Sequence, residues 1–499
     1  MISAKLQNRI LVAFFALYAC VTLYTVVHHE PGRDETAPWL VVRDTAFLDI
    51  FRELHYQLHP FLWYLIMFPF AKLGLPCFTI AILNWLMAAG IVYLLLWRSP
   101  FPKLTGVLAA FSFYLFWAYS IEARGVYALG FLLLFIIAVN YKSRFSHPLR
   151  YGILLFLLAN TNAFMVPTAA GLVFIWFAEA WFDKKLSPKL FCAMGIVALG
   201  GLFAAWELGA IFPLSDLPAL GRTDNVGFQI SALPKAIVGA FFTGINPVPF
   251  LFVPALVILA FLLRPFLSRP YSGTFCVIHI LGNLAAIGIK PVYLCERHYG
   301  IILMGIVFAL WIAHYEKDLI PKKRAFDASF AARFAAASIA LNISFLSSTG
   351  LGMMMSYYDW NYLYSGCSQM AAFIKNNNLE RFPIASQRYG HLTPVAAFLP
   401  GKKFWYAGIA KDATFVHQDA THMNVGHVMP YEQALKKIDE HFPPSEEILI
   451  LLDVELKNTA GSKYKLLHKV DKEVFGSDER CYLYLRTPQT ADPQIRLFQ

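Results

Sequence analysis

Long runs of apolar residues, separated by short polar junctions, fill the first 350 residues of the chain. A helix needs about 20 apolar residues to cross a bilayer, so these runs predict membrane-spanning helices. The run at 236–263 contains Asn246, Pro247 and Pro249, which predicts that it is broken or strongly tilted. We expect spans at 10–27, 77–97, 105–120, 126–140, 148–162, 163–182, 190–212, 236–263, 272–289, 299–313 and 328–350.

One apolar run does not fit this series. Residues 60–73 are apolar, but a run of this length is typical of a re-entrant or interfacial helix. A full crossing here would also break the alternation of basic junctions further along the chain. We therefore expect 60–73 to stay on the outer side of the membrane or to be partly inserted.

Basic residues gather at every second junction, which sets the expected orientation. Because Lys and Arg are enriched on the cytoplasmic side, the amino terminus should lie in the cytoplasm and the carboxyl-terminal region outside. The first apolar segment has no small-residue cleavage site after it, so it is read as an uncleaved anchor. The basic junctions contain Lys5/Arg9, Arg98/Lys103, Lys142/Arg144/Arg150, Lys184/Lys185/Lys189, Arg264/Arg269 and Lys317/Lys322/Lys323/Arg324.

The pattern changes after Ser356, where the long apolar runs end. Helical spacing is expected at 365–379 and 431–441, and strands are expected at 447–453 and 481–486. This mixture predicts a compact α/β domain.

The predicted fold class is therefore a polytopic α-helical membrane protein with about eleven spans and a carboxyl-terminal extracytoplasmic α/β domain. Residues 1–350 form the membrane domain and residues 351–499 form the soluble domain. A protein of this kind belongs in the cytoplasmic (inner) membrane, with membrane lipids around it.

Composition supports the membrane assignment. The chain is 58% hydrophobic and 15% charged, against about 25% charged residues in soluble domains. Residues 351–499 hold equal numbers of basic and acidic side chains, so the whole net charge of +10 belongs to the membrane part. The excess of basic residues is explained by membrane topology. The chain has no basic tail that would indicate binding to nucleic acid.

Acidic residues follow the first span on the outer side. Asp34 and Glu35 come first, and Asp44 lies further along the same junction. Acids in an exposed loop after a helix are common and need no function. A carboxylate at this place could also remove a proton from an acceptor hydroxyl.

Cationic and aromatic residues lie at later outer junctions. Arg124 and Tyr127 are three residues apart and would share a helix face. A snorkelling arginine beside an interfacial tyrosine would explain them without function. Lys290, Arg297 and His298 lie together in another outer junction, where topology alone does not call for cations. Such groups could hold a phosphate.

Several histidines and one acid are weaker candidates. His59 lies before the short apolar run, and Glu207 lies near the outer end of its span, where one acid can also snorkel. His417, His422 and His427 recur every five residues, which is not helical metal-ligand spacing, so no metal site is assigned.

Two cysteines lie in the carboxyl-terminal region. Cys367 and Cys481 could pair if that region faces an oxidising compartment, but the sequence does not decide whether they do.

These motifs together resemble the GT-C superfamily of glycosyltransferases, which use polyprenyl-phosphate sugars. The similarity is greatest to its protein mannosyltransferase and aminoarabinose-transferase branch. Two departures weaken the match: Phe61 stands where that branch has a second proline, and one extra residue separates Arg124 from Tyr127. The matching segments are Asp34-Glu35, His59-Pro60-Phe61-Leu62-Trp63-Tyr64-Leu65, Ala123-Arg124-Gly125-Val126-Tyr127-Ala128-Leu129 and Arg297-His298-Tyr299.

The resemblance implies roles for these residues. Asp34 would be the base, with Glu35 or Asp44 orienting the acceptor. Arg124, Arg297 and Lys290 would stabilise the departing lipid phosphate. The donor would be a polyprenyl-phosphate-linked sugar and the reaction would invert the anomeric centre. The acceptor hydroxyl or amine would belong to a glycan, lipid or protein, and participation of a divalent metal is left open.

Two other functional classes compete with this interpretation. A polytopic transporter or flippase of a lipid-linked or amphipathic substrate would also need many spans, but it predicts repeats and ionisable residues at the midplane. Here the polar groups gather near one membrane surface instead. A scaffold that anchors a soluble domain would not need eleven spans.

Overall fold

The computed structural model describes most of the chain. The described residues are 3–57, 59–209, 228–245, 248–289, 295–316, 324–387, 392–415, 417, 429–457, 463–471, 474–475 and 479–488.

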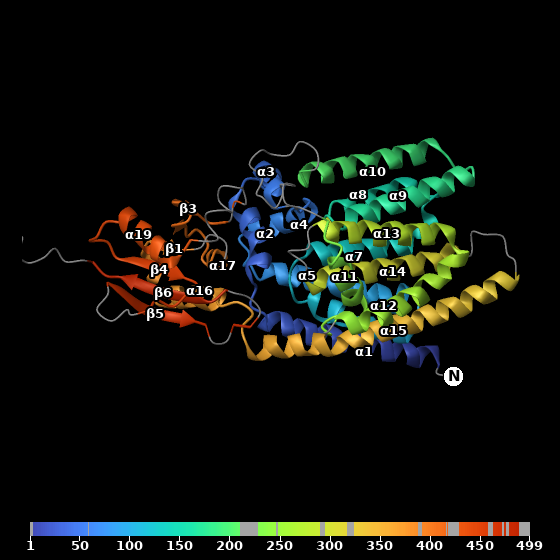
Figure 1. Ribbon diagram of the computed structural model, residues 1–499. Coiled ribbons are helices and arrows are strands. Elements are labelled where there is room, and N and C mark those ends of the chain that lie inside the picture. Colours follow the sequence, from blue (N-terminus) through green and yellow to red (C-terminus); the bar gives the residue numbers. More distant parts are fainter. Residues whose placement is uncertain are drawn as a thin grey trace, which may run out of the picture.

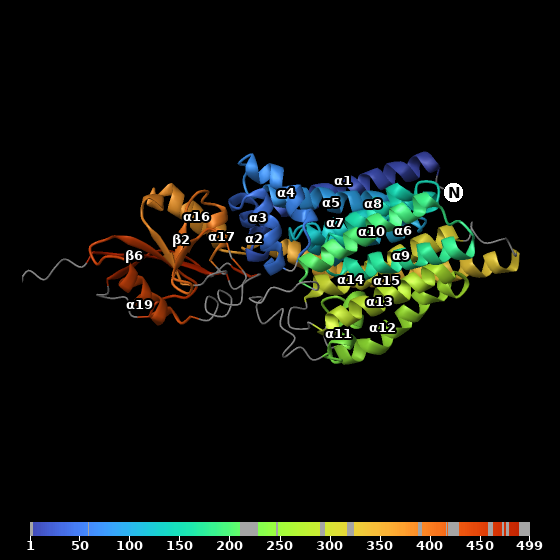
Figure 2. The ribbon, with the colours of Figure 1, turned by 90° about the horizontal axis from the view of Figure 1, so that it is seen from above.

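A helical bundle and a smaller soluble domain lie end to end, with α2 (Arg33–Asp44), α3 (Phe47–Gln57) and α4 (Leu62–Lys72) between them (Figures 1 and 2). We call the bundle end that faces the soluble domain the outer end, and the opposite end the inner end. The amino terminus lies at the inner end.

Nine helices within the described residues are long and apolar enough to cross a membrane, two fewer than the sequence predicts. The expected span at 148–162 is the shorter apolar helix α8, and the expected span at 105–120 is divided between α6 and the π-helical turn η2. The bundle helices are α1 (Ala4–His28), α5 (Thr79–Tyr93) continued by η1 (Leu94–Arg98), α6 (Lys103–Ala110), η2 (Tyr114–Ala118), α7 (Val126–Asn140), η3 (Tyr141–Ser143), α8 (Pro148–Ala159), α9 (Met165–Phe182), α10 (Pro188–Glu207), α11 (Ala232–Phe241), α12 (Val248–Leu263), η5 (Arg264–Ser268), α13 (Pro270–Ile289), α14 (Glu296–Glu316) and α15 (Arg324–Asn361).

The run at 236–263 is broken, as its prolines predict. It consists of the short apolar helix α11 and of α12, which together with η5 is long enough to cross a membrane without α11. The short helix α4 stays at the outer end. Its first residue, Leu62, donates its backbone N–H to the Asn160 carbonyl, 3.2 Å away, at the outer end of α8. The Lys72 ammonium at its other end donates to the carbonyls of Arg43 (2.9 Å) and Thr45 (2.6 Å) beside α2.

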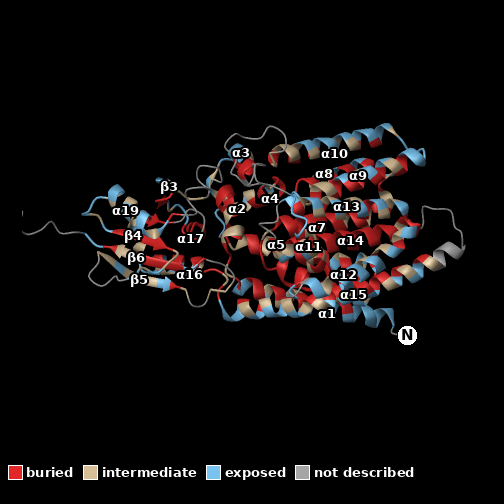
Figure 3. Cartoon of the chain, viewed as in Figure 1, coloured by how far each residue is buried: buried red, intermediate tan, exposed pale blue. Residues whose placement is uncertain are grey.

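The helix that carries Arg297 and His298 is the most enclosed of the nine. In α14, 83% of the apolar window is buried, compared with 28% in α1 and 22% in the span that contains α12. Figure 3 shows α14 as buried along its length, whereas neighbouring helices expose one face. Large apolar side chains such as Phe250 and Leu199 are exposed on those faces, as expected where helices meet lipid.

The soluble domain is built on one mixed sheet of six strands in the order β3-β2-β1-β4-β6-β5. Strand β1 pairs in parallel with β2 and β4, and the remaining pairs are antiparallel. The strands are β1 (Ile384–Ser386), β2 (Phe404–Tyr406), β3 (Lys411–Ala413), β4 (Ile448–Leu452), β5 (Tyr464–Val470) and β6 (Cys481–Arg486), and the helices are α16 (Cys367–Asn376), η7 (Leu379–Arg381), α17 (Pro394–Ala397) and α19 (Tyr431–His441).

The most apolar elements of this domain were predictable. Strand β4 has five consecutive buried residues, and both β4 and β6 lie where the sequence places them. Helix α16 begins at Cys367, two residues after the expected start at Ser365. Helix α15 continues to Asn361, past residue 350 where the membrane domain was expected to end.

Candidate active site

Asp34 meets two arginines from distant parts of the chain at the outer end. Its Oδ2 lies 3.2 Å from Nη1 of Arg124 and 3.5 Å from Nη2 of Arg297, while Oδ1 lies 3.5 Å from Nε of Arg33. Asp34 is in the first turn of α2, Arg124 precedes α7, and Arg297 is the second residue of α14. The Asp34 side chain is 42% exposed, so the cluster is open to solvent on one side.

A second acid holds Arg297 in this cluster. The Arg297 guanidinium donates from Nη1 to Oε1 of Glu122, which is buried. The Tyr119 hydroxyl donates to the Arg297 carbonyl at 2.6 Å. With both its backbone and its head group held, Arg297 has a fixed position beside Asp34.

Glu35 is buried, unlike its neighbour Asp34. Its Oε2 accepts the Gly32 N–H at 2.8 Å, which closes the first turn of α2, and its Oε1 accepts the Ala123 N–H at 2.6 Å. One carboxylate therefore joins the segment before Asp34 to the segment before Arg124.

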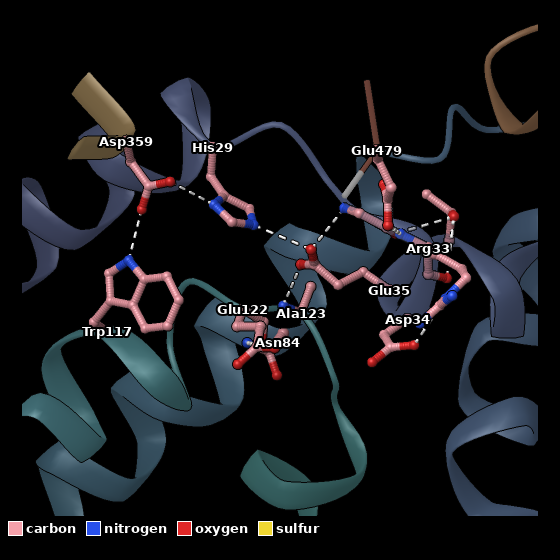
Figure 4. A network of polar contacts seen from close by, with 12 residues as sticks. His29, Arg33, Asp34, Glu35, Asn84, Trp117, Glu122, Ala123, Asp359 and Glu479 are labelled. Carbon is pink, nitrogen blue, oxygen red and sulfur yellow. Dashed lines mark hydrogen bonds and ion pairs between the residues drawn. The ribbon is translucent and has the colours of Figure 1, made fainter. Parts of the chain in front are cut away.

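His29 continues this network toward the last span. Its Nε2 lies 3.1 Å from Oε2 of Glu35, and its Nδ1 lies 2.8 Å from Oδ1 of Asp359 near the end of α15. Asp359 also accepts from Nε1 of Trp117 at 2.6 Å. Figure 4 shows the chain of contacts from Trp117 through Asp359 and His29 to Glu35. Helix α1, the loop before α2 and α15 are thus tied together.

Tyr127 and His298 contact each other across the bundle. The Tyr127 oxygen lies 2.9 Å from Nε2 of His298, and Nδ1 of His298 lies 3.2 Å from the backbone N of Cys295. The pair is buried and joins α7 to α14. The phosphate contact expected of both residues stays a prediction.

The remaining candidates fall in different places. Asp44 lies ten residues after Asp34, about 15 Å along α2. It pairs with Arg43 at 2.7 Å and lines a cavity of about 400 Å³ against the soluble domain. Glu207 accepts the Phe61 N–H at 3.2 Å through Oε2. Lys290 lies outside the described residues.

His59 lies close enough to the arginines to feel their charge. Burial, and then Arg124 and Arg297, lower the pKa of His59 to about 4, against the opposing effect of Asp34. Its Nδ1 is buried without a hydrogen-bond partner among the described residues. His59 is therefore neutral near pH 7.

Electrostatics keep Asp34 ionised. Arg124 has the largest effect in lowering the pKa of Asp34 far below its usual range, and Arg33 and Arg297 add to it against the effect of burial. Burial disfavours the charged form of His29, but Asp359 and Glu35 outweigh it and raise the pKa of His29 well above its usual value. The cluster thus contains a carboxylate that stays charged and a buried imidazolium behind it.

Sequence reasoning missed several members of this cluster. Glu122 stands two residues before Arg124, so an acid beside an arginine at an outer junction was a usable signal. Arg33 directly precedes Asp34, so it had a similar signal. His29 and Asp359 had none, because they meet across 330 positions in a buried network. Glu479 of the soluble domain, whose Oε1 accepts the Arg33 N–H at 2.8 Å, was equally hidden.

Metal ligands do not gather in the described part of the chain. No group of three or more His, Cys, Asp or Glu residues there is arranged to hold a metal ion. His417 instead pairs with Glu53, 2.6 Å away, and His422 and His427 lie outside the described residues.

This architecture is a polytopic helical bundle with a carboxyl-terminal domain. The chain has the fold of ArnT from Cupriavidus metallidurans, as seen in the crystal structure of that protein bound to undecaprenyl phosphate. The TM-score is 0.53 at 10% sequence identity, over 97% of this chain and 99% of ArnT. No protein-family model matches the sequence, and no curated protein gives a significant match. The resemblance read from the sequence motifs is thus confirmed at the level of fold.

Proposed function

We propose that this protein is an inverting glycosyltransferase, which moves a sugar from a polyprenyl-phosphate donor to an acceptor hydroxyl or amine. The reaction would take place at the outer face of the cytoplasmic membrane. The observation that carries the proposal is the meeting of Asp34 with Arg124 and Arg297 at the outer end of the bundle. The shared fold with ArnT, which was crystallised with undecaprenyl phosphate, supports a lipid-phosphate donor.

The arginines suit the leaving group. A departing lipid phosphate carries negative charge on oxygens that planar guanidinium groups can bind in a bidentate way. Arg124 and Arg297 come from two different helix ends, so a phosphate could be held from two sides. Preorganised donors of this kind contribute about 3–4 kcal/mol to transition-state stabilisation in other enzymes.

Asp34 suits the role of base. Its carboxylate is ionised and partly exposed, so an acceptor can reach it. A strongly acidic carboxylate is a weak base, but the low pKa of Asp34 depends mainly on Arg124, with Arg33 and Arg297 as further counter-ions. When a phosphate binds Arg124 and Arg297, the pKa of Asp34 rises and its affinity for the acceptor proton increases. The donor would thereby switch on the base.

Proton, sugar and phosphate then move in one displacement. Asp34 takes the proton from the acceptor while the acceptor oxygen or nitrogen attacks the anomeric carbon. The bond to the phosphate oxygen breaks on the opposite face, and the configuration inverts. The buried contacts of Glu35 favour a structural role, in which it fixes the positions of Asp34 and Arg124 and leaves the acceptor untouched. Asp44 is too far along α2 to act on the same proton.

The substitution Asp34→Asn tests the base. It should decrease sugar transfer by about 10²–10⁴-fold, the usual contribution of general-base catalysis, while the protein still folds and inserts. Transfer from a radiolabelled polyprenyl-phosphate sugar in proteoliposomes measures this effect. Asp49→Asn is the matched control, because Asp49 is an exposed acid on α3 of the same surface. Full transfer by Asp34→Asn would remove Asp34 from the mechanism.

The transporter alternative makes a different prediction. A flippase would move the lipid-linked sugar between leaflets without changing the bond to phosphate. Chromatography of the labelled product after incubation with acceptor extracts distinguishes the two, since only transfer releases free polyprenyl phosphate.

A further inference from the structure

Two cysteines of the soluble domain lie against each other beneath the site. The sulfur atoms of Cys367 and Cys481 are 3.7 Å apart, and both residues are completely buried. Cys367 begins α16 and Cys481 begins β6, so the contact joins segments that are 114 positions apart in the sequence. A sulfur–sulfur bond is about 2.05 Å long, so the two side chains need only a small rotation to reach it.

The segments around these cysteines hold the loop that leads into α2, the helix that carries Asp34. Ser368, next to Cys367, donates its hydroxyl to the Glu30 carboxylate. Glu479, two residues before Cys481, accepts the Arg33 N–H at 2.8 Å. The two segments are also joined to each other, because the Gly366 N–H donates to the Glu479 carbonyl at 3.0 Å.

We propose that Cys367 and Cys481 form a disulfide bond in the mature protein, which clamps the two soluble-domain segments that hold the loop before Asp34. The inference rests on the proposed function only for the location of this domain outside the cytoplasm, where disulfides persist. The bond deepens that function because it stabilises the contacts that hold the loop before Asp34.

The chemistry balances as thiol–disulfide exchange. The thiolate of one cysteine attacks a disulfide of an oxidant protein and forms a mixed disulfide with it. The thiolate of the second cysteine then attacks this mixed disulfide and displaces the oxidant. The two thiols lose two protons and two electrons, and the oxidant leaves as a dithiol. Since both sulfurs are buried in the folded domain, the exchange belongs to folding, and the finished bond is protected from reductants.

Differential alkylation of the full-length protein tests the bond. Cells are denatured in excess N-ethylmaleimide, and the purified protein is then reduced and labelled with a heavier maleimide. Peptide mass spectrometry should find the heavy label on Cys367 and Cys481, and the light label on Cys77 and Cys276. Light label on both Cys367 and Cys481 would overturn the proposal.

Single and double variants provide the control. In Cys481→Ser, Cys367 should take the light label, because its partner is gone. In the full-length protein, heating with a reductant should decrease the melting temperature of the soluble-domain transition by roughly 4–16 °C, and should not change it in the variant with both Cys367→Ser and Cys481→Ser. An equal effect of reductant on both proteins would also contradict the proposal.

Transfer activity separates this inference from the proposed function. The Asp34→Asn variant should keep the disulfide while it loses transfer. Active protein with two light-labelled cysteines would refute the disulfide alone. Inactive wild-type protein with the disulfide intact would refute the proposed function alone.

Discussion

Removing the charge of Asp34 should strengthen binding of polyprenyl phosphate while it decreases transfer. In the structure, Asp34 is a counter-ion of Arg124 and Arg297, at 3.2 and 3.5 Å. A phosphate that binds these arginines must displace the carboxylate or bind beside it against its charge. In Asp34→Asn the guanidinium groups lose this competitor.

The expected gain in phosphate affinity follows from the solvent exposure of the contacts that Asp34 makes with Arg124 and Arg297. The Asp34 side chain is 42% exposed, so each contact is screened by water. Exposed ion pairs contribute about 0.2–1 kcal/mol each. Two such contacts give about 0.4–2 kcal/mol, which corresponds to roughly 2- to 30-fold tighter phosphate binding. The gain should become smaller as salt is added, because ions screen exposed charges.

Equilibrium binding of a fluorescent polyprenyl phosphate to purified protein measures this affinity. Asp49→Asn, on the same surface, should bind like the wild type. Weaker binding to Asp34→Asn than to wild type would refute the reasoning, since it would make the carboxylate part of the phosphate site instead of its competitor.

Three further predictions concern the supports of the site. Arg297→Ala should raise the KM for the donor more than the KM for the acceptor, because the guanidinium is assigned to the phosphate; steady-state kinetics with each substrate varied measures both. Gly125→Ala should lower stability by about 1–3 kcal/mol and also slow transfer, because a Cβ there would lie 2.3 Å from the Trp63 ring; thermal unfolding and kcat check it. Burial raises the pKa of Glu479 to about 7 from 4.5, so the stability contributed by its protonated form is present below pH 4.5 and lost as pH rises through 7. For the wild type, this change in the free energy of unfolding amounts to at most about 3 kcal/mol. Glu479→Gln should make the free energy of unfolding less dependent on pH, and melting curves recorded at different pH values measure it.

Each of these predictions has a matched control. Arg52→Ala removes an exposed arginine from α3 and should leave both KM values unchanged. Gly195→Ala adds a methyl group where nothing lies within 4 Å and should have little effect. Glu446→Gln, elsewhere in the soluble domain, should keep the pH dependence of the wild type. Equal effects in a variant and its control would contradict the corresponding prediction.

The alternation of basic junctions predicted more of the fold than any single motif did. It placed Asp34, Arg124 and Arg297 on one side, and the structure brings them into contact there. It also kept 60–73 at that side, where α4 lies. These results follow from counting crossings, which depends only on the lengths of apolar runs and on charge.

The sequence did not predict which residues of the site are buried or which of them contact each other. Glu35 and Asp34 are neighbours in sequence, yet one is buried in a network and the other is open to solvent. Helix geometry points adjacent side chains in different directions, and only the packing of the Ala123 segment decides which acid is enclosed. His29 and Asp359 meet across more than 300 residues, a distance over which local patterns carry no information. The short strands β1, β2 and β3 have three residues each, too few for a periodic signal.

A structure of the protein with polyprenyl phosphate bound would test the central claim most directly. The account predicts the phosphate at the outer end of the bundle, within hydrogen-bond distance of the guanidinium groups of Arg124 and Arg297, with Asp34 displaced from at least one of them. A phosphate bound at the inner end, or at the outer end without contact to either arginine, would contradict it.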